Sequence, residues 1–219
     1  MRPPDVPSSL ALRFAVGLYS RFVFPWLCDT LLGRPFLAKY RRELLATVEG
    51  DVLEIGFGTG LNLPHYPPQV RKISAIDPNV GARRRAQRRI QSSGVEVDQR
   101  PLDCERLPFG DGSFDCVVSS WTLCSIEDVS QALGEVYRVL RPGGRFLFLE
   151  HGLSPDPQVR KWQRRLNWLE YRLGGGCRLD RDIRALVTAQ PFASVDVDEF
   201  SLEQIPRTHG HMYRGVARK

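Results

Sequence analysis

The chain has 219 residues, of which 42% are hydrophobic and 26% charged, and its formal net charge is +6. This length and composition suit one globular domain of the larger sort, with room for an added cap, and they exclude disordered and collagen-like classes. No uncharged apolar run approaches the ~20 residues of a membrane-spanning helix, and charged side chains interrupt any apolar stretch of signal-peptide type near the N-terminus.

Residues 1–47 predict an N-terminal helical cap or lid. The first nine residues are rich in Pro and Ser and are expected to fray. Helices are expected over residues 10–20, 22–32 and 35–46. Pro25 is expected to break the second helix, and Pro35 suits the first position of the third.

Residues 48–219 predict one α/β domain. Strands are expected over residues 51–55, 72–76, 95–101, 114–119 and 145–150. Helices are expected over residues 79–91, 127–140, 156–172 and 180–189. The segments 193–200 and 211–217 follow each other without a helix, which predicts an antiparallel hairpin at one edge. Apolar strands that alternate with helices predict a sheet covered on both faces.

The five cysteines fit free thiols better than a disulfide framework. Their number is odd, and no two of them stand in a CxxC spacing. The four histidines include no HxxxH pair, so the spacing predicts no metal site. Free thiols indicate a reducing compartment, and the expected location is the cytoplasm.

The positive charge lies on the flanks of the chain. Residues 1–50 carry +3 and residues 151–219 carry +4, whereas the middle carries −1. Basic flanks suit nucleic acid, anionic lipid or an acidic substrate. The arginines at 83–85 and 88–89 lie opposite an Ala/Ile face of their helix, so a solvated surface is the preferred interpretation and no nucleic-acid partner is predicted.

The sharpest signal is a glycine loop directly after the first strand of the domain. Gly56, Gly58 and Gly60 let the backbone turn tightly and approach a ligand closely. Asp77 ends the next strand, where a carboxylate can accept hydrogen bonds from both ribose hydroxyls of a nucleoside. The GxGxG spacing departs from the GxGxxG dinucleotide pattern. Glu54 would repel a pyrophosphate but tolerate the cationic amino-acid end of a cofactor.

Residues 45–152 resemble the class I S-adenosylmethionine-dependent methyltransferases, of the methyltransferase type 11 group. The matching motifs are residues 54–60, 75–79, 102–109, 114–119 and 140–145. The resemblance implies a Rossmann-like seven-stranded sheet of order 3-2-1-4-5-7-6 with strand 7 antiparallel. It also implies S-adenosyl-L-methionine as the cofactor and methyl transfer as the activity.

The resemblance assigns roles to residues of these motifs. The three glycines would wrap the methionine part of the cofactor, with Glu54 at its amino end. Asp77 would hold the ribose and Asp103 the adenine amino group, and a turn-capping acid is the alternative role for Asp103. Further cofactor-binding residues implied by the motifs are Phe57, Thr59, Asn62, Pro78, Cys104, Ser119 and Ser120.

A narrower resemblance is to the alkyl-thiol S-methyltransferases and their bacterial relatives. It rests on residues 62–68, 123–125, 150–151 and 175–179. It implies a small, apolar acceptor such as an alkyl thiol. A lipid-like acceptor (a quinone precursor or phosphatidylethanolamine), a non-catalytic cofactor-binding partner and an RNA methyltransferase stay open as alternatives. The N-terminal helices are shorter than the membrane anchor of the animal members, and as amphipathic helices they leave peripheral membrane contact open.

Acceptor contacts are expected from the N-terminal helices and from the loops after the fourth and fifth strands. Candidate substrate residues are Tyr19, Trp26, Trp121 and Thr122. His151 is a candidate general base and Cys124 a candidate nucleophile. The alternatives at these two positions are a histidine that orients a loop and a packed small residue. A thiol acceptor has an ordinary pKa of about 8.5 and ionises without a strong base.

Overall fold

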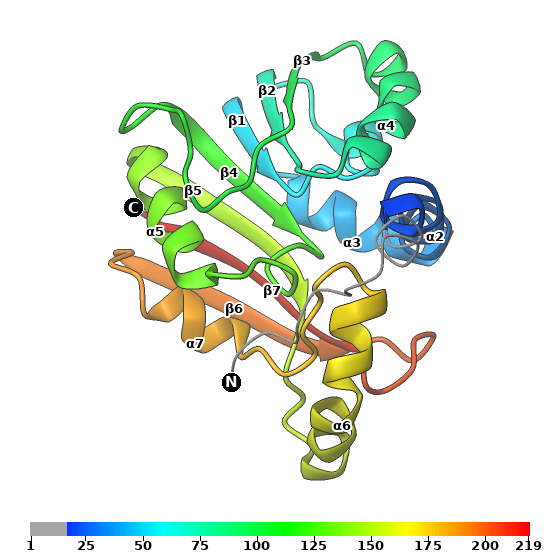
Figure 1. Cartoon of the computed structure of the whole chain (residues 1–219). Coiled ribbons are helices and arrows are strands. Elements are labelled where there is room, and N and C mark those ends of the chain that lie inside the picture. Colours follow the sequence, from blue (N-terminus) through cyan, green and yellow to red (C-terminus); the bar gives the residue numbers. More distant parts are fainter. Residues whose placement is uncertain (1–16) are drawn as a thin grey trace.

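Seven strands form one sheet in the order β3-β2-β1-β4-β5-β7-β6 (Figure 1). The computed structural model describes residues 17–219. The strands are β1 (Gly50–Ile55), β2 (Val70–Ile76), β3 (Glu96–Arg100), β4 (Phe114–Ser120), β5 (Leu140–His151), β6 (Ser194–Ser201) and β7 (His211–Arg218). β7 runs antiparallel to both of its neighbours, and the other pairs are parallel. The expected Rossmann-like α/β fold and strand order are therefore confirmed.

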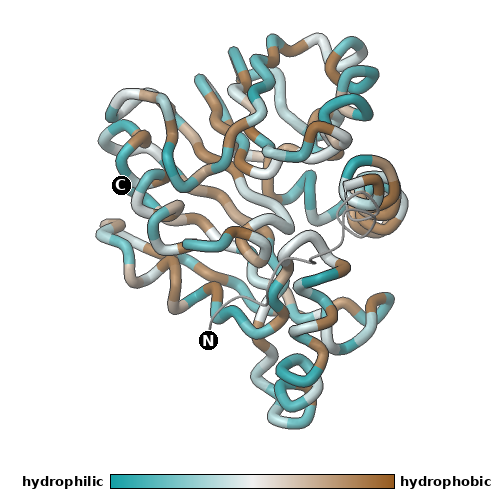
Figure 2. Tube along the Cα trace, viewed as in Figure 1, coloured by the Kyte–Doolittle hydropathy of each residue, from teal (hydrophilic) through white to brown (hydrophobic). Residues whose placement is uncertain are grey.

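The central strands are buried on both faces because helices cover each side. Val52 and Val118 pack with α3 (Pro35–Leu45) and α4 (Val80–Ser93) in one apolar cluster. Leu53 and Val117 pack with α5 (Val129–Val139) and α7 (Ile183–Thr188) in the other. Neighbouring residues of a strand thus point to opposite faces of the sheet, and both faces are shielded from solvent. Figure 2 shows the result as hydrophobic colour along the central strands.

The N-terminal helices lie beside the carboxyl ends of β1 and β4. They are a π-helical turn, η1 (Tyr19–Val23), then α2 (Phe24–Leu32) and α3. Most of the expected helix over residues 10–20 lies outside the described part of the chain. The helical run continues through Pro25, which stands in the first turn of α2 directly after the π-helical turn η1. The backbone therefore changes its helix type just before the proline, which cannot donate an N–H to the preceding turn.

The boundary between α5 and β5 differs most from expectation. α5 ends at Val139, and β5 begins at once with Leu140 rather than at residue 145. Gly143 has a φ of +77°, and the pairing of β4 with β5 shifts register between Phe114 and Cys116. The segment Pro142-Gly143-Gly144 is therefore accommodated as an irregularity within a longer strand.

The remaining elements complete the molecule. They are a short 3-10 turn, η2 (Leu63–His65), and the long helix α6 (Pro157–Leu173). Within residues 17–219, every helix is too short or too polar to cross a lipid bilayer.

Candidate cofactor site and acceptor cavity

The glycine loop after β1 is shaped by three left-handed glycines. Gly56, Gly58 and Gly60 have φ values of +67°, +56° and +79°. A Cβ on Gly56 would lie 2.0 Å from the hydroxyl oxygen of Thr122, which follows β4. The absence of a side chain at Gly56 therefore lets the loops at the ends of two adjacent parallel strands touch.

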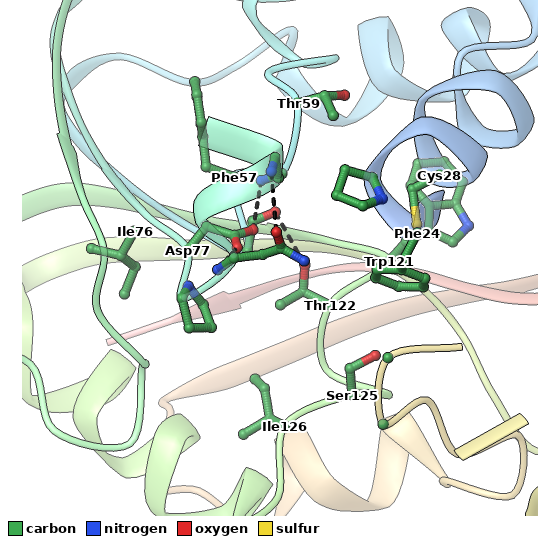
Figure 3. A pocket seen from close by; sticks show the side chains of 18 of the residues that line it. Phe24, Cys28, Phe57, Thr59, Ile76, Asp77, Trp121, Thr122, Ser125 and Ile126 are labelled. Carbon is green, nitrogen blue, oxygen red and sulfur yellow. Dashed lines mark hydrogen bonds between the residues drawn. The ribbon is translucent and has the colours of Figure 1, made fainter. Parts of the chain in front are cut away.

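Asp77 joins the end of β2 to the glycine loop. Its Oδ2 accepts a hydrogen bond from the amide of Gly58 at 2.7 Å, and its Oδ1 accepts one from the amide of Asn79 at 2.7 Å. Figure 3 shows this side chain at the cavity, below the loop that carries Phe57. Burial raises the pKa of Asp77, while the two amides oppose that shift. A carboxylate has about four acceptor positions, so two remain for a ligand.

Glu54 is a buried acid at the floor of the site. Its side chain accepts hydrogen bonds from Asn62 at 2.8 Å and from the Tyr66 hydroxyl at 2.7 Å. Asn62 also accepts a bond from Arg41 at 2.7 Å and donates one to Ser120 at 3.0 Å. Burial raises the pKa of Glu54 to about 7, against the opposing effect of these donors and of the Arg41 charge. The acid is thus poised to ionise near neutral pH.

The N-terminal helices are tied to the glycine loop by charged side chains. Asp29 on α2 accepts bonds from the Thr59 hydroxyl at 2.6 Å and from Arg89 on α4 at 2.8 Å. Arg41 on α3 is 4% exposed, and its guanidinium lies 4.5 Å from the centre of the Trp121 ring. α2 and α3 therefore form part of the site wall.

Trp121 holds a backbone conformation that non-glycine residues seldom adopt. It follows β4 with a φ of 50°, and it is the one such residue in the described chain. Its amide donates to the carbonyl of Leu149 at 2.9 Å. A conformation of this kind costs on the order of 1 kcal/mol and persists where the surroundings impose it. Its ring is held at the cavity wall by that backbone and by Arg41.

These elements enclose a cavity of about 930 Å³. It is lined by most of the expected cofactor-binding residues, namely Glu54, Gly56, Phe57, Gly58, Thr59, Asn62, Asp77, Pro78, Asp103, Cys104 and Ser120. Gly60 shapes the loop without lining the cavity, and Ser119 is buried beneath it, where it donates to Glu150 at 2.6 Å. Asp103 accepts a bond from the amide of Glu105 at 3.1 Å, so it also caps a turn.

The expected acceptor residues divide into two groups. Tyr19, Trp121 and Thr122 line the cavity. Trp26 does not, because α2 turns Pro25 and Cys28 inward and leaves the Trp26 side chain 52% exposed. Phe24, Cys28 and Trp121 lie on the same side of the cavity in Figure 3.

The two candidate catalytic residues lie behind the cavity wall. Cys124 is 2% exposed and His151 is 7% exposed, and neither lines the cavity. His151 Nε2 lies 3.2 Å from Cys177 Sγ. Two thiols of the described chain do line the cavity, Cys28 and Cys104, and burial raises the pKa of each to about 12, so both stay protonated at neutral pH.

Sequence reasoning missed the roles of Asp29 and Arg41. Their partners lie 30 and 21 residues away, and hydropathy patterns carry no information about such pairings. One signal was present for Arg41. It stands on the same helix face as Leu37, Leu44 and Leu45, which are all buried, and a charge on an apolar face indicates a specific partner.

Comparison with known proteins decides the family. Residues 53–148 match the family described as "Methyltransferase domain". The chain is 31% identical over 195 residues to the thiol S-methyltransferase TMT1B of Rattus norvegicus, which covers 80% of this chain and 77% of that protein. The chain belongs to the class I S-adenosylmethionine-dependent methyltransferase family. As a member, this methyltransferase is an enzyme that uses S-adenosylmethionine.

Two further relatives extend the comparison. The methyltransferase is 29% identical over 180 residues to the phosphatidylethanolamine N-methyltransferase of Cereibacter sphaeroides, with 79% of this chain and 83% of that protein covered. A solved N-methyltransferase of Haemonchus contortus in complex with S-adenosylhomocysteine has a TM-score of 0.73 at 14% identity, covering 94% of this chain and 60% of that one. At 14% identity, the similarity to this solved structure shows a shared fold only.

Proposed function

We propose that this methyltransferase transfers the methyl group of S-adenosylmethionine to a small apolar thiol. The observation that carries the proposal is the make-up of the acceptor side of the cavity. Its wall contains the side chains of Tyr19, Phe24, Pro25, Trp121 and Tyr171, and no histidine of the described chain lines the cavity. The name of the rat relative, a thiol S-methyltransferase, supports the same acceptor class.

The cofactor is proposed to lie along the glycine loop. Asp77 would accept bonds from the ribose hydroxyls with the two acceptor positions that its backbone partners leave unused. Glu54 would attract the amino end of the methionine part, and Asp103 at the rim would meet the adenine. When bound, S-adenosylmethionine supplies a methyl group that is already activated on a sulfonium. The protein then has to align the acceptor and exclude water.

A thiol suits a cavity whose lining, among the described residues, includes no histidine. A thiol as acidic as a cysteine side chain, with a pKa of about 8.5, is partly ionised near neutral pH, whereas an amine as basic as a lysine side chain, with a pKa of about 10.4, is almost fully protonated there. Glu127 is a carboxylate on this wall, but Arg178 donates to it at 2.6 Å and the Tyr171 hydroxyl donates to it at 3.2 Å. A carboxylate engaged in this way is a poor proton acceptor.

Phosphatidylethanolamine is the second candidate acceptor, with peripheral membrane contact as its route of delivery. Large apolar side chains are exposed on the N-terminal helices and on α6: Phe22 and Trp26 are 50% and 52% exposed, and Trp162 and Trp168 are 54% and 63% exposed. Arg165 lies 5.4 Å from the Trp162 ring centre. Tryptophan beside basic side chains suits a lipid headgroup region.

A labelled-methyl assay distinguishes the acceptors. The enzyme is given labelled S-adenosylmethionine with alkyl thiols of increasing chain length, with the matching alcohols and amines, or with vesicles of phosphatidylethanolamine. The proposal expects label in the thiols, with the catalytic efficiency rising with chain length. Label in the amines or the phospholipid alone would overturn it in favour of the second candidate.

A further inference from the structure

Three metal-binding side chains converge behind the cavity wall. Cys124, His151 and Cys177 each offer a ligand atom, and these atoms all lie within 4.8 Å of one another. All three residues are buried, and they come from the loop after β4, the end of β5 and the loop after α6. We propose that this group, the Cys2His cluster, binds a zinc ion. The proposal does not depend on the identity of the acceptor.

The spacing of the cluster suits tetrahedral zinc. Zinc–sulfur bonds of about 2.3 Å and zinc–nitrogen bonds of about 2.0 Å place the ligand atoms of a tetrahedral site ~3.5–3.8 Å apart. His151 Nε2 lies 3.2 Å from Cys177 Sγ, and no pair in the cluster exceeds 4.8 Å. A small adjustment of side chains would therefore bring these atoms to three of the four tetrahedral positions, and a water molecule would take the fourth. Two thiolates with one imidazole select zinc over the harder cations, calcium and magnesium.

The imidazole of His151 lacks the partners that a buried histidine ordinarily has. Its Nδ1 is buried and has no hydrogen-bond partner in residues 17–219. Its other nitrogen faces the sulfur of Cys177, and sulfur is a weak hydrogen-bonding atom. A buried polar group without a partner is costly and calls for an explanation. Coordination of a metal ion through Nδ1 would give that nitrogen the partner that it lacks.

The loop that carries Cys124 is held rigidly from two sides. The buried Arg181 donates hydrogen bonds to the carbonyls of Leu123 and Ile126, which lie on either side of Cys124 in the chain. Glu150 accepts the amide of Leu123 at 3.1 Å. A sulfur ligand on such a loop is placed before any metal arrives, as a specific metal site requires.

The Cys177 segment is bound to the Cys124 segment by its backbone. The amide of Arg178 donates to the carbonyl of Cys124 at 2.9 Å, and the amide of Cys177 donates to that of Gly174 at 3.2 Å. Ser125 and Gly176, the neighbours of the two cysteines, both line the cavity. A zinc ion here would clamp the loop after β4 to the loop after α6 and so hold two parts of the acceptor wall together.

Metal analysis of the whole protein tests the proposal. The reduced protein is purified without chelator and its zinc content is measured. It is then stripped and titrated with Co²⁺, a spectroscopic substitute for zinc. The expected results are stoichiometric zinc and an intense sulfur-to-cobalt charge-transfer absorption. A protein that binds neither metal, or that binds cobalt without that absorption, would overturn the proposal.

Variants test whether the metal binds at the Cys2His cluster. Cys124→Ser and Cys177→Ser are expected to weaken zinc binding at least ~10-fold. Cys116→Ala, a fully buried thiol of β4 outside the cluster, is the matched control and should bind zinc as the parent does. Equal loss in the control would count against the assignment. So would a titration of thiols that finds Cys124 and Cys177 joined as a disulfide in the purified protein, and this readout needs no variant to fold.

Discussion

The carboxylate of Asp77 accepts a hydrogen bond from the amide of Gly58 at 2.7 Å, and so joins the end of β2 to the glycine loop after β1. The second carboxylate oxygen is held in the same way by the amide of Asn79. The loop is therefore ordered by the protein itself. A site formed in advance loses less conformational entropy when a ligand binds, and this favours affinity.

Gly56→Ala tests the close approach of the two loops. The new methyl group would meet the Thr122 side chain at 2.0 Å, so we expect methyl transfer to fall at least ~10-fold, which corresponds to about 1.4 kcal/mol. Gly94→Ala is the matched control, because Gly94 has a similar φ of +71° but open space around its Cβ position. Both variants carry the backbone strain, and only the first carries the collision. Equal activity in the two would contradict the role given to Gly56.

Arg41→Met tests the link between α3 and the site. The substitution leaves the buried Asn62 oxygen without its donor and removes the cation from the Trp121 ring. Loss of a buried hydrogen bond to a charged group costs about 2 kcal/mol of unfolding free energy. Urea denaturation measures this loss. Arg42→Met, an exposed neighbour on the same helix, should change stability by less than about 0.5 kcal/mol, and a comparable loss there would contradict the assignment.

The pH dependence of stability reports on Glu54. Burial raises its pKa from 4.5 to about 7 in the folded protein, so the folded state binds the proton more tightly than the unfolded state does. Stability conferred by the neutral acid is therefore complete below pH 4.5 and is lost as the pH rises through 7. Over that window the parent should lose stability relative to Glu54→Gln by about 3 kcal/mol at most. Denaturation curves of both proteins across pH 4–8 measure the difference, and a constant difference would exclude the shift.

The same ionisation should govern cofactor binding. A Glu54 carboxylate attracts the cationic end of the cofactor only when it is charged, so the affinity for S-adenosylmethionine is expected to rise between pH 6 and pH 8. In Glu54→Gln this rise should disappear. Fluorescence or calorimetric titrations at each pH provide the affinities. An unchanged pH profile in the variant would show that Glu54 does not face the cofactor.

Much of the fold could be predicted because its signals are local. Each signal occupies a short run of consecutive residues: the apolar strands, the helix that Asn79 caps, and the glycine loop. The family resemblance supplied the strand order. Asn79 caps α4 with bonds to the amides of Gly81 and Ala82, which is a local relationship of this kind. Asp77 belongs here too, since the end of a strand marks the ligand-binding edge of a parallel sheet.

The rest depends on contacts between distant segments. Cys124, His151 and Cys177 lie far apart in the chain, so their spacing resembles no metal motif, and the fold alone brings them together. Whether Trp26 points into the cavity or to solvent depends on how α2 is rotated about its axis. The pattern of apolar residues does not define that rotation, because α2 is short and apolar on several sides. Both cases require knowledge of packing rather than of pattern.

Calorimetric titration with S-adenosylmethionine, for the parent and for Asp77→Ala, is the most direct measurement of whether the cavity at the glycine loop is the cofactor site. The parent should bind, and the variant should bind at least ~30-fold more weakly, which is about 2 kcal/mol. Asp111→Ala, which changes an acid that is 82% exposed and remote from the cavity, should bind as the parent does. Equal affinity in the parent and in a folded Asp77→Ala protein would contradict the site.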